Sequence, residues 1–466
     1  MRHMLLDFIE RQEWMRPKIR PSLGSIASLV LAAATLMGCG SSTKIDEDED
    51  VPSSNTVRGP EWVESTHGKS APDTSGAFRL AKRDFLVSVD QATWNSMLSS
   101  LVQACGASAP FHCNGTTLDS YDSVSAWRMA DLYTDGQKWA SIGIRMVSNG
   151  DLADAWKDST FRFPLRISMD KWEKERPTID NQRFYGFQKL SLSNLSGDST
   201  GLRHQVASAA YRSQGVPAYR SSLVGLRLAH GTDTLDLGLY SLREAIDGPM
   251  LSRWFSTDSG NLYEPSSALG SFIATEFSEG DHDGTFADVG AFVRNLNATN
   301  RTVAPATWRS ALESTFDVAG FIDWLAVSTI LGDRGTYGSD SGNYALYNDR
   351  GRLRWMALSL DQTFPTGSGL ARGIWHSTDA GWPLITNLLA DSVYCETFAS
   401  KVRGLTGGGG ALSPTKLGEL VTSVSSASLD GRVDATTRKE KLLLFASQRQ
   451  SAIDTSLAAH TCPYRN

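Results

Sequence analysis

The residues of this chain best suited to chemistry lie in one loop and just beyond the hairpin expected after it. Residues 332–349 read GDRGTYGSDSGNYALYND, with three Asp and four Gly but no Lys or His. Asp333 and Asn343 lie on this loop, and Asp361 ends the apolar run LRWMALSLD. Carboxylate and amide oxygens are the ligands that Mg²⁺ prefers. The pattern predicts a site for Mg²⁺ and a phosphate group, and a solvated turn is the structural alternative.

Three elements are expected to position these side chains. Apolar residues recur with helical spacing in FIDWLAVSTIL, which places Asp333 just after the end of a helix. NYALYND and RLRWMALSL have the composition of two strands, with Asn343 at the start of the first and Asp361 after the second. Phosphoryl transfer requires positioned metal ligands and a carboxylate near the attacking hydroxyl. This part of the chain supplies both kinds of residue.

Strand patterns dominate the first half of the chain, and helical patterns dominate the second. DFLVSVDQATWNSMLSSLVQAC predicts a strand and then a helix capped by Asp90, and Asp135-Gly136 predicts a hairpin turn. DSTGLRHQVASAAYRSQG predicts a helix that ends at Gly215. We therefore predict an α+β fold whose order of elements is that of a two-lobed protein kinase. The first lobe spans about 80–245 and the second about 246–466.

Several segments resemble one known family in the right order. The core FIDWLAVSTILGDRGTYGSDSGNYALYNDRGRLRWMALSLDQTF is similar to that of the CotH kinase family, the spore-coat-protein-H-like atypical kinases. The segments YTDGQKWASIGIRMVSNG, GFQKLSLSN, LGLYSLREAIDGPMLSRWF, GNLYE and WPLITNLL also resemble family segments. The resemblance covers roughly residues 130–430. It implies a divergent kinase fold that binds ATP and Mg²⁺ and phosphorylates Ser or Thr of exported or surface proteins.

The resemblance also implies roles for individual residues. Asp333 is the expected catalytic base, and Asn343 and Asp361 are the expected metal ligands. Glu244 is expected close to the nucleotide, as the Glu that follows the Tyr-x-Leu strand. The phosphates are expected to be held by Arg162 or Arg166 in FRFPLRI and by Lys189 one strand later.

Some positions depart from the kinase pattern. Ordinary kinases space the base and the metal-binding Asn as D-x-x-x-x-N, whereas Asp333 and Asn343 are ten positions apart, so Asp340 is an alternative base. Ser359 replaces the first Asp of the family's Asp-x-Asp pattern. His204 and Gln205 stand where an ion-pairing Glu is expected. A catalytically degenerate, kinase-shaped surface scaffold or adhesin is therefore the alternative function.

The first 79 residues are expected to serve export and anchoring. Residues 1–39 hold a basic segment, a short apolar run and Leu-Met-Gly-Cys ending at Cys39, which resembles a bacterial lipobox. Lipidation of Cys39 would anchor the protein to a membrane of the bacterial cell envelope, facing the periplasm or the exterior. Residues 40–79, with five consecutive acids at 46–50, predict a disordered tether.

Four further cysteines favour disulfides in an exported chain. They allow three pairings, of which we predict Cys105–Cys113, a short loop, and Cys395–Cys462, which would connect C-terminal helices. A zinc site is the rival interpretation, but the chain has no CxxC and no nearby pair of His residues.

Other functions receive little support. The net charge of −6 gives no case for nucleic-acid binding. GDSTG around Ser199 matches the G-x-S-x-G pattern of a serine hydrolase, with Asp361 and His376 following in hydrolase order. A polar stretch separates it from the preceding strand, and helix capping explains its residues as well. Trp375, His376 and Trp382 could form a binding face in the adhesin interpretation.

Overall fold

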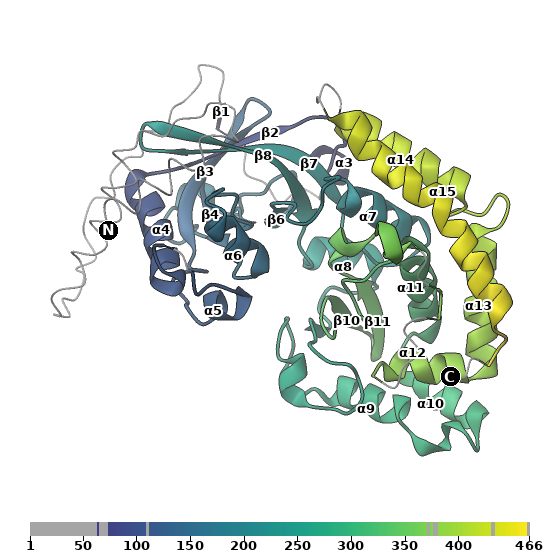
Figure 1. Cartoon of the computed structure of the whole chain (residues 1–466). Coiled ribbons are helices and arrows are strands. Elements are labelled where there is room, and N and C mark those ends of the chain that lie inside the picture. The colour runs from purple at the N-terminus through teal and green to yellow at the C-terminus, as the bar shows by residue number, and fades with distance from the viewer. Residues whose placement is uncertain are drawn as a thin grey trace. The chain divides into compact units, whose positions relative to one another are not determined.

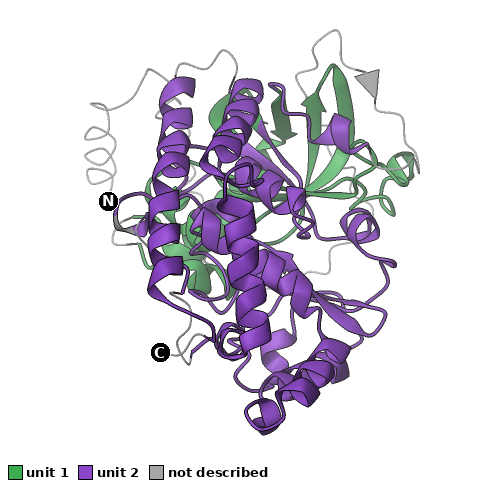
Figure 2. Cartoon of the chain, turned by 90° about the vertical axis from the view of Figure 1, so that its right-hand side faces the viewer, with its two compact units in different colours: residues 1–71, 83–194, 224–239 green, residues 72–82, 195–223, 240–466 purple. Residues whose placement is uncertain are grey.

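The computed structural model describes residues 63–64, 73–108, 111–370, 373–375, 381–429 and 434–463. The chain forms two compact units, which Figure 2 shows in different colours. Unit 1 comprises residues 1–71, 83–194 and 224–239, and unit 2 comprises 72–82, 195–223 and 240–466. The units thus interleave along the sequence, whereas the predicted lobes are contiguous. The lobe boundary at residue 245 stays a prediction.

The strands of the first part of the chain form one sheet of eight strands in the order β1-β4-β3-β2-β7-β8-β6-β5. β4 also pairs with β5, so the sheet closes on itself. Figure 1 labels the strands of this sheet other than β5. Their bounds are β1 (Val63–Glu64), β2 (Asp84–Val89), β3 (Arg128–Thr134), β4 (Gln137–Met146), β5 (Leu165–Ser168), β6 (Lys189–Ser193), β7 (Ser221–His230) and β8 (Asp233–Glu244).

Local sequence signals explain the turns and caps of unit 1. The hairpin between β3 and β4 turns at Asp135 and Gly136, which both have positive φ, as a tight hairpin requires. Helix α4 (Gln91–Cys105) begins where the Asp90 side chain accepts a hydrogen bond from the Thr93 amide at 2.6 Å. Two short helices, α5 (Gly115–Asp119) and α6 (Gly150–Lys157), complete the unit. The predicted strand, helix and hairpin are confirmed here.

Helices make up most of unit 2. Their bounds are α3 (Thr74–Ala77), α7 (Arg203–Ser213), α8 (Gly248–Trp254), α9 (Ala287–Leu296), α10 (Pro305–Thr315), α11 (Val318–Leu331), α12 (Pro383–Ala390), α13 (Ser392–Thr406), α14 (Pro414–Ser428) and α15 (Ala435–Ala459). α11 packs against α13, and α14 packs against α15 and α7. Helix α3 lies within the predicted tether and buries Ala77, so structured chain begins before residue 80.

A small sheet carries the chemistry-bearing hairpin of unit 2. β10 (Tyr344–Asp349) pairs antiparallel with β11 (Arg352–Ala357) and with the short β9 (Leu262–Tyr263). The predicted hairpin is therefore confirmed. Its aromatic residues anchor it to α11, because Trp355 stacks on Tyr344 at 4.3 Å and contacts Trp324 of α11 at 4.9 Å between ring centroids. These large buried rings hold the hairpin against the helix that precedes the acidic loop.

The predicted α+β class is confirmed, with a strand-rich first part and a helical second part. Both predicted disulfides are present, Cys105–Cys113 in unit 1 and Cys395–Cys462 in unit 2. None of the described helices is long and apolar enough to cross a membrane. The predicted signal peptide, the lipobox at Cys39 and most of the tether lie outside the described residues.

Candidate functional site

The end of helix α11 determines where Asp333 lies. Gly332 ends the helix in the left-handed conformation, with φ of 63°, which glycine adopts without steric cost. The Asp333 amide then donates to the Ser328 carbonyl at 3.0 Å, which fixes the backbone at Asp333. A side chain at residue 332 would also collide with Pro365, whose Cδ lies 2.9 Å from an ideal Cβ. Glycine at position 332 is therefore required for two reasons, the left-handed backbone and the close contact with Pro365.

The Asp333 carboxyl group is buried and held from two sides. Its Oδ1 accepts a hydrogen bond from the Gly335 amide at 3.1 Å, and its Oδ2 accepts one from the Tyr211 hydroxyl at 3.2 Å. Burial raises the pKa of Asp333 to about 7, and the nearby charge of Asp361 also raises it. A carboxylate with such a pKa gains and loses a proton near neutral pH, which is the property of an effective general base.

The loop after β11 places Asp361 beside the same helix end. The Phe364 amide donates to the carbonyl of Leu331, the last residue of α11, at 2.9 Å. The loop also packs on Gly335, because an ideal Cβ there would lie 2.5 Å from Cγ of Gln362. Chain segments on either side of the hairpin are therefore in direct contact, and this contact brings the Asp333 and Asp361 loops together.

Asp361 itself lies in the short 3-10 turn Leu360–Gln362 and is half buried. Its Oδ1 accepts a hydrogen bond from the Ser359 hydroxyl at 3.1 Å, and Arg203 donates to its backbone carbonyl at 3.1 Å. Ser359 has φ of 54°, which turns the chain out of the strand. The residue that replaces the family's first Asp is thus a positioning partner of Asp361.

Asn343 lies at the same end of the hairpin, because the next residue, Tyr344, pairs with Ala357 of β11. It has φ of 61°, which Asn tolerates, and the Thr336 hydroxyl donates to its backbone carbonyl at 3.2 Å. Its side chain is exposed and, among the described residues, hydrogen-bonds to neither Asp333 nor Asp361. Its exposed position is compatible with a metal ligand. It takes no part in the hydrogen bonds that hold Asp333 and Asp361.

The alternative base, Asp340, has a different environment. It is exposed, and its Oδ1 accepts a hydrogen bond from the Gly342 amide at 2.8 Å within the loop. That bond closes a local turn of the kind that Asp commonly forms. Asp333 is buried, accepts a hydrogen bond from Tyr211 of α7 and has a raised pKa. Its environment therefore suits a base better than that of Asp340.

The donor set fits Mg²⁺ in part. Among the described residues, no group of three or more His, Cys, Asp or Glu is arranged to hold a metal ion. Mg²⁺ in phosphoryl-transfer sites is usually held by one or two protein oxygens together with substrate phosphates and water. The half-exposed Asp361 carboxylate and the exposed Asn343 amide are the oxygens of this set that remain accessible.

A buried group that the sequence did not reveal lies behind Asp361. His204 and Tyr219 share a hydrogen bond of 2.7 Å, and the Tyr219 hydroxyl accepts a longer one from the Leu360 amide at 3.4 Å. The Arg243 guanidinium lies over the Tyr219 ring, 5.7 Å from its centroid. Burial, and then the charge of Arg243, lowers the pKa of His204 to about 4, so the ring is neutral at physiological pH.

Glu244 forms a structural tie in the structure. Arg253 of α8 donates to both of its carboxylate oxygens, at 2.6 and 2.7 Å, and the Arg220 amide donates at 3.0 Å. Arg253 is therefore the ion-pair partner of Glu244. Contact of Glu244 with a nucleotide stays a prediction.

The expected phosphate-binding residues Arg166 and Lys189 lie in unit 1, on β5 and β6. Both side chains are exposed. Arg166 pairs across the sheet with Arg145, and its charge contributes, after burial, to lowering the pKa of Arg145. Arg162 instead donates to the carbonyls of Asn194 and Leu239, at 2.7 and 2.8 Å, which makes it a structural residue. The roles of Arg166 and Lys189 stay predictions.

Two residues singled out by the alternative interpretations have environments that do not fit the roles expected there. Ser199 does not lie in a tight strand-to-helix turn of the hydrolase kind, since nine residues separate the end of β6 at Ser193 from the start of α7 at Arg203. Its hydroxyl accepts a hydrogen bond from Lys441 at 3.2 Å. Trp375 cannot belong to an exposed binding face, because it is buried and its indole N–H donates to the Ser456 carbonyl at 2.9 Å. His376 lies outside the described residues.

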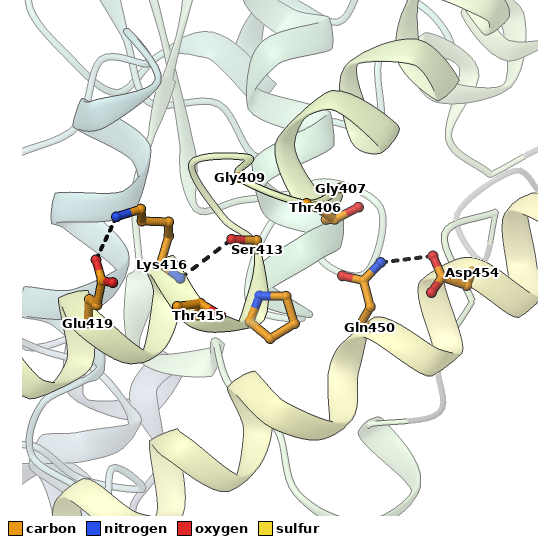
Figure 3. Close-up of a pocket in the computed structure, with 11 residues that line it drawn as sticks. Thr406, Gly407, Gly409, Ser413, Thr415, Lys416, Glu419, Gln450 and Asp454 are labelled. Carbon is orange, nitrogen blue, oxygen red and sulfur yellow. Dashed lines mark hydrogen bonds and ion pairs between the residues drawn. The ribbon is translucent and has the colours of Figure 1, made fainter.

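An open pocket of about 590 Å³ lies elsewhere in unit 2, at the start of α14 (Figure 3). The glycines 407–409 form one rim, and Gln450 and Asp454 of α15 form another. Its polar side chains pair with one another, Lys416 with Glu419 and Gln450 with Asp454, both at 2.8 Å. The charges of Lys416 and Glu419 cancel, whereas the neutral Gln450 amide leaves the negative charge of Asp454 uncompensated, so these pairs leave the pocket no excess positive charge for an anionic ligand.

The structure thus defines an α+β protein in which two aspartates, one of them buried with a pKa raised to about 7, come together at the end of a helix. A family model described as CotH kinase protein matches residues 150–449, nearly two thirds of the chain. The chain belongs to the CotH kinase family, as the sequence segments predicted.

Two solved structures are similar at low identity. The proinflammatory kinase CtkA of Helicobacter pylori matches at 11% identity with a TM-score of 0.29, over 59% of this chain and 91% of that one. HipA of Shewanella oneidensis, in its complex with HipB and operator DNA, matches at 11% identity with a TM-score of 0.27, over 59% of this chain and 61% of that one. A search of curated proteins gave no match.

Proposed function

We propose that this chain is an atypical protein kinase that uses ATP and Mg²⁺ to phosphorylate Ser or Thr side chains of exported or surface proteins. The observation that supports it is the buried Asp333 carboxyl, with a pKa near 7, beside the half-exposed Asp361. Family membership supports the same class of activity. Neither a structural turn nor a surface acid requires a carboxyl group to be buried at such a cost.

In this proposal each residue has a distinct task. The Asp333 carboxylate accepts the proton of the substrate hydroxyl. At the same time the hydroxyl oxygen of the substrate bonds to the γ-phosphorus of ATP, and the bond from that phosphorus to the leaving oxygen of ADP breaks. Tyr211 orients that carboxylate through its 3.2 Å hydrogen bond. Asp361 and Asn343 would hold Mg²⁺, which when bound neutralises charge on the phosphate oxygens. Arg166 and Lys189 are proposed to contact the phosphates of the nucleotide.

The proposed location of the activity is the cell envelope. Two disulfides are typical of an oxidising compartment, and the sequence of residues 1–39 resembles a lipoprotein signal. Lipidation at Cys39 would tether the enzyme to a membrane, where exported proteins are its substrates. Labelling cells with a fatty-acid analogue tests this, since a Cys39→Ala variant should lose the label.

A second candidate function is a kinase-shaped scaffold that does not transfer phosphate. It is supported by His204, which is buried and neutral. His204 lies on the helix where the family resemblance predicts a Glu that forms an ion pair. A neutral ring cannot orient a phosphate-binding Lys through an ion pair. Such a protein would present its surface to a partner and would need no nucleotide.

One set of variants separates the two functions. Wild-type protein and Asp361→Asn, Asp333→Asn and Asp340→Asn variants are titrated with MgATP in a thermal-shift assay and then tested for transfer of labelled phosphate. The kinase proposal expects a MgATP-dependent rise in Tm that Asp361→Asn abolishes. It also expects loss of transfer in Asp333→Asn but not in Asp340→Asn, the matched exposed acid of the same loop.

The opposite results are equally informative. Wild-type protein that shows neither a MgATP-dependent shift nor transfer is a scaffold. Transfer that persists in Asp333→Asn and disappears in Asp340→Asn would move the base to Asp340.

A further inference from the structure

A cluster of three arginines surrounds one buried carboxylate in unit 2. Arg212 lies in the last turn of helix α7, Arg220 follows it on the chain, and Arg253 lies on α8. Glu244, at the end of β8, is the carboxylate between them. The four residues come from four segments, so their proximity is a product of the fold.

The contacts of Glu244 leave most of this positive charge uncompensated. The Glu244 side chain is fully buried and is satisfied by the two guanidinium nitrogens of Arg253 and by the Arg220 backbone amide. The charges that act on Arg212 are those of Arg220, Arg253 and Glu244, and Arg220 responds to Arg253 and Glu244. Three positive charges therefore face one negative charge in a partly buried place.

Several N–H donors of the cluster are also unused. Arg212 donates through Nε to the Ser208 hydroxyl at 3.2 Å, and no other hydrogen bond of its side chain is formed with the described residues. The Arg220 guanidinium likewise has no hydrogen-bond partner in the described part of the chain, and the buried Arg253 Nε has none. In unit 1, by contrast, Arg162 uses its donors on two backbone carbonyls.

This arrangement is electrostatically costly without an anion. Burial, followed by repulsion from Arg220 and Arg253, lowers the pKa of Arg212 to about 10. Burial and then Arg253 also lower the pKa of Arg220. A dianion placed among these guanidinium groups would remove the repulsion and accept the free N–H donors.

We infer that Arg212, Arg220 and Arg253 form a binding site for a phosphate group. Guanidinium groups match phosphate because their paired N–H donors meet two phosphate oxygens at once. A phosphate dianion also balances the two excess charges of the cluster. A single compact site of this kind suits one phosphate group rather than a nucleic-acid backbone, and the net charge of the chain is −6.

The site is adjacent to the groups behind Asp361. Tyr219 and Arg220 are consecutive, as are Arg243 and Glu244, and the Glu244 amide donates to the Arg220 carbonyl at 2.9 Å. One residue of each pair belongs to the arginine cluster, and the other belongs to the His204–Tyr219 group. A phosphate bound by the arginines would therefore lie next to the backbone segment that positions Tyr219.

Binding is tested on the whole chain with inorganic phosphate as the probe, by isothermal titration at constant ionic strength. The variants are Arg212→Gln and Arg220→Gln. The matched control is Arg294→Gln, at an exposed arginine near the end of α9 that forms no ion pair with the described residues. Wild type and the control should bind one phosphate saturably. Each cluster variant should bind at least about tenfold more weakly, the loss expected for one charged hydrogen-bonding group.

Further arms identify the source of the phosphate. A phosphoserine peptide and ATP without Mg²⁺ compete with inorganic phosphate, and the stronger competitor shows which ligand the site takes. The Asp361→Asn variant should retain phosphate binding, so this result is independent of the proposed kinase activity. Arg220→Lys, which keeps the charge but not the paired donors, replaces Arg220→Gln if that variant does not fold, as judged by circular dichroism.

Two results would overturn the inference. The first is the absence of saturable phosphate binding to the wild-type chain. The second is equal binding by wild type, Arg220→Gln and Arg294→Gln, which would mark a general effect of salt on a charged surface.

Discussion

The Tyr211 hydroxyl lies 3.2 Å from the Asp333 carboxylate, and it joins helix α7 to the loop after α11. The two residues are 122 positions apart. Through this bond a helix in the middle of the chain determines the orientation and the charge of the proposed base. The predictions below follow from this relationship and from the contacts around it.

The first prediction concerns the pH dependence of Asp333. Its pKa is raised to about 7 in the folded chain, above the unfolded value near 3.8, so between these values the folded chain binds more protons. The contribution of this group to the free energy of unfolding should therefore decrease as pH rises from about 4 to 7, whereas the rate of transfer should rise through pH 7 as the base ionises.

Asp333→Asn should remove both effects. Its difference in unfolding free energy from wild type, measured by urea denaturation at pH 5 and pH 8, should favour the variant more at pH 8. Transfer should fall about 10²-fold or more, the usual contribution of a general base. A pH-independent difference in stability between the two proteins would contradict the raised pKa.

The second prediction concerns Tyr211→Phe. The hydroxyl stabilises the charged form of Asp333, so its removal should raise the pKa of the carboxyl group further. The pH–rate profile should shift to higher pH by up to about one unit, since a hydrogen bond to a charged group contributes about 1.5 kcal/mol. Kinetics across pH 6–9 measure this.

Tyr263→Phe is the matched control for this profile. Tyr263 is also buried and also donates to a carboxylate, that of Asp288 at 2.8 Å, but Asp288 has no part in the proposed site. Its loss should lower stability without a shift of the profile. If both variants shift the profile equally, Tyr211 acts through stability alone.

The third prediction tests the contact between the two loops. Gly335→Ala places a Cβ about 2.5 Å from Cγ and 2.8 Å from Cβ of Gln362, so the Asp361 loop must move. The MgATP-dependent rise in Tm should decrease, and a Gln362→Gly change in the same chain should restore part of it. Gly150→Ala, where nothing lies within 4 Å of the new Cβ, should have no such effect.

Two results would contradict this account of the Gly335–Gln362 contact. If Gly335→Ala binds MgATP as wild type does, the close approach of the two loops is not required for the site. If Gln362→Gly alone causes the same loss as Gly335→Ala, the side chain of Gln362 rather than the collision is responsible.

The fourth prediction compares the two disulfides. Cys395–Cys462 closes a loop with a sequence separation of 67, whereas Cys105–Cys113 closes one of 8. Because a longer closed loop restricts the unfolded chain more, the first should contribute about 4 kcal/mol and the second about 2.5 kcal/mol. Paired Cys→Ser variants compared by urea unfolding measure the difference, and a larger loss from the short loop would contradict this account.

Local patterns alone determined much of this protein. Apolar spacing located α11 and the β10–β11 hairpin, Asp135-Gly136 located a turn, and the order of motifs identified the family. These features depend on residues a few positions apart, whose backbone preferences act within one element. The pairing of Cys395 with Cys462 also followed from their places at the ends of C-terminal helices.

The tertiary structure alone decided which acids share one site and what charge they carry. The sequence favoured Asp333 as the base but left Asp340 as an alternative, and in the fold Asp333 is the one that is buried against Tyr211. Only the fold pairs Glu244 with Arg253 and leaves Arg212 and Arg220 with unused donors. Burial and long-range contact set the pKa of a carboxyl group, because both depend on segments that are distant in the chain. The composition of the acidic loop therefore predicted a candidate site, and the packing of α7 against the loop decided which of its acids is buried there.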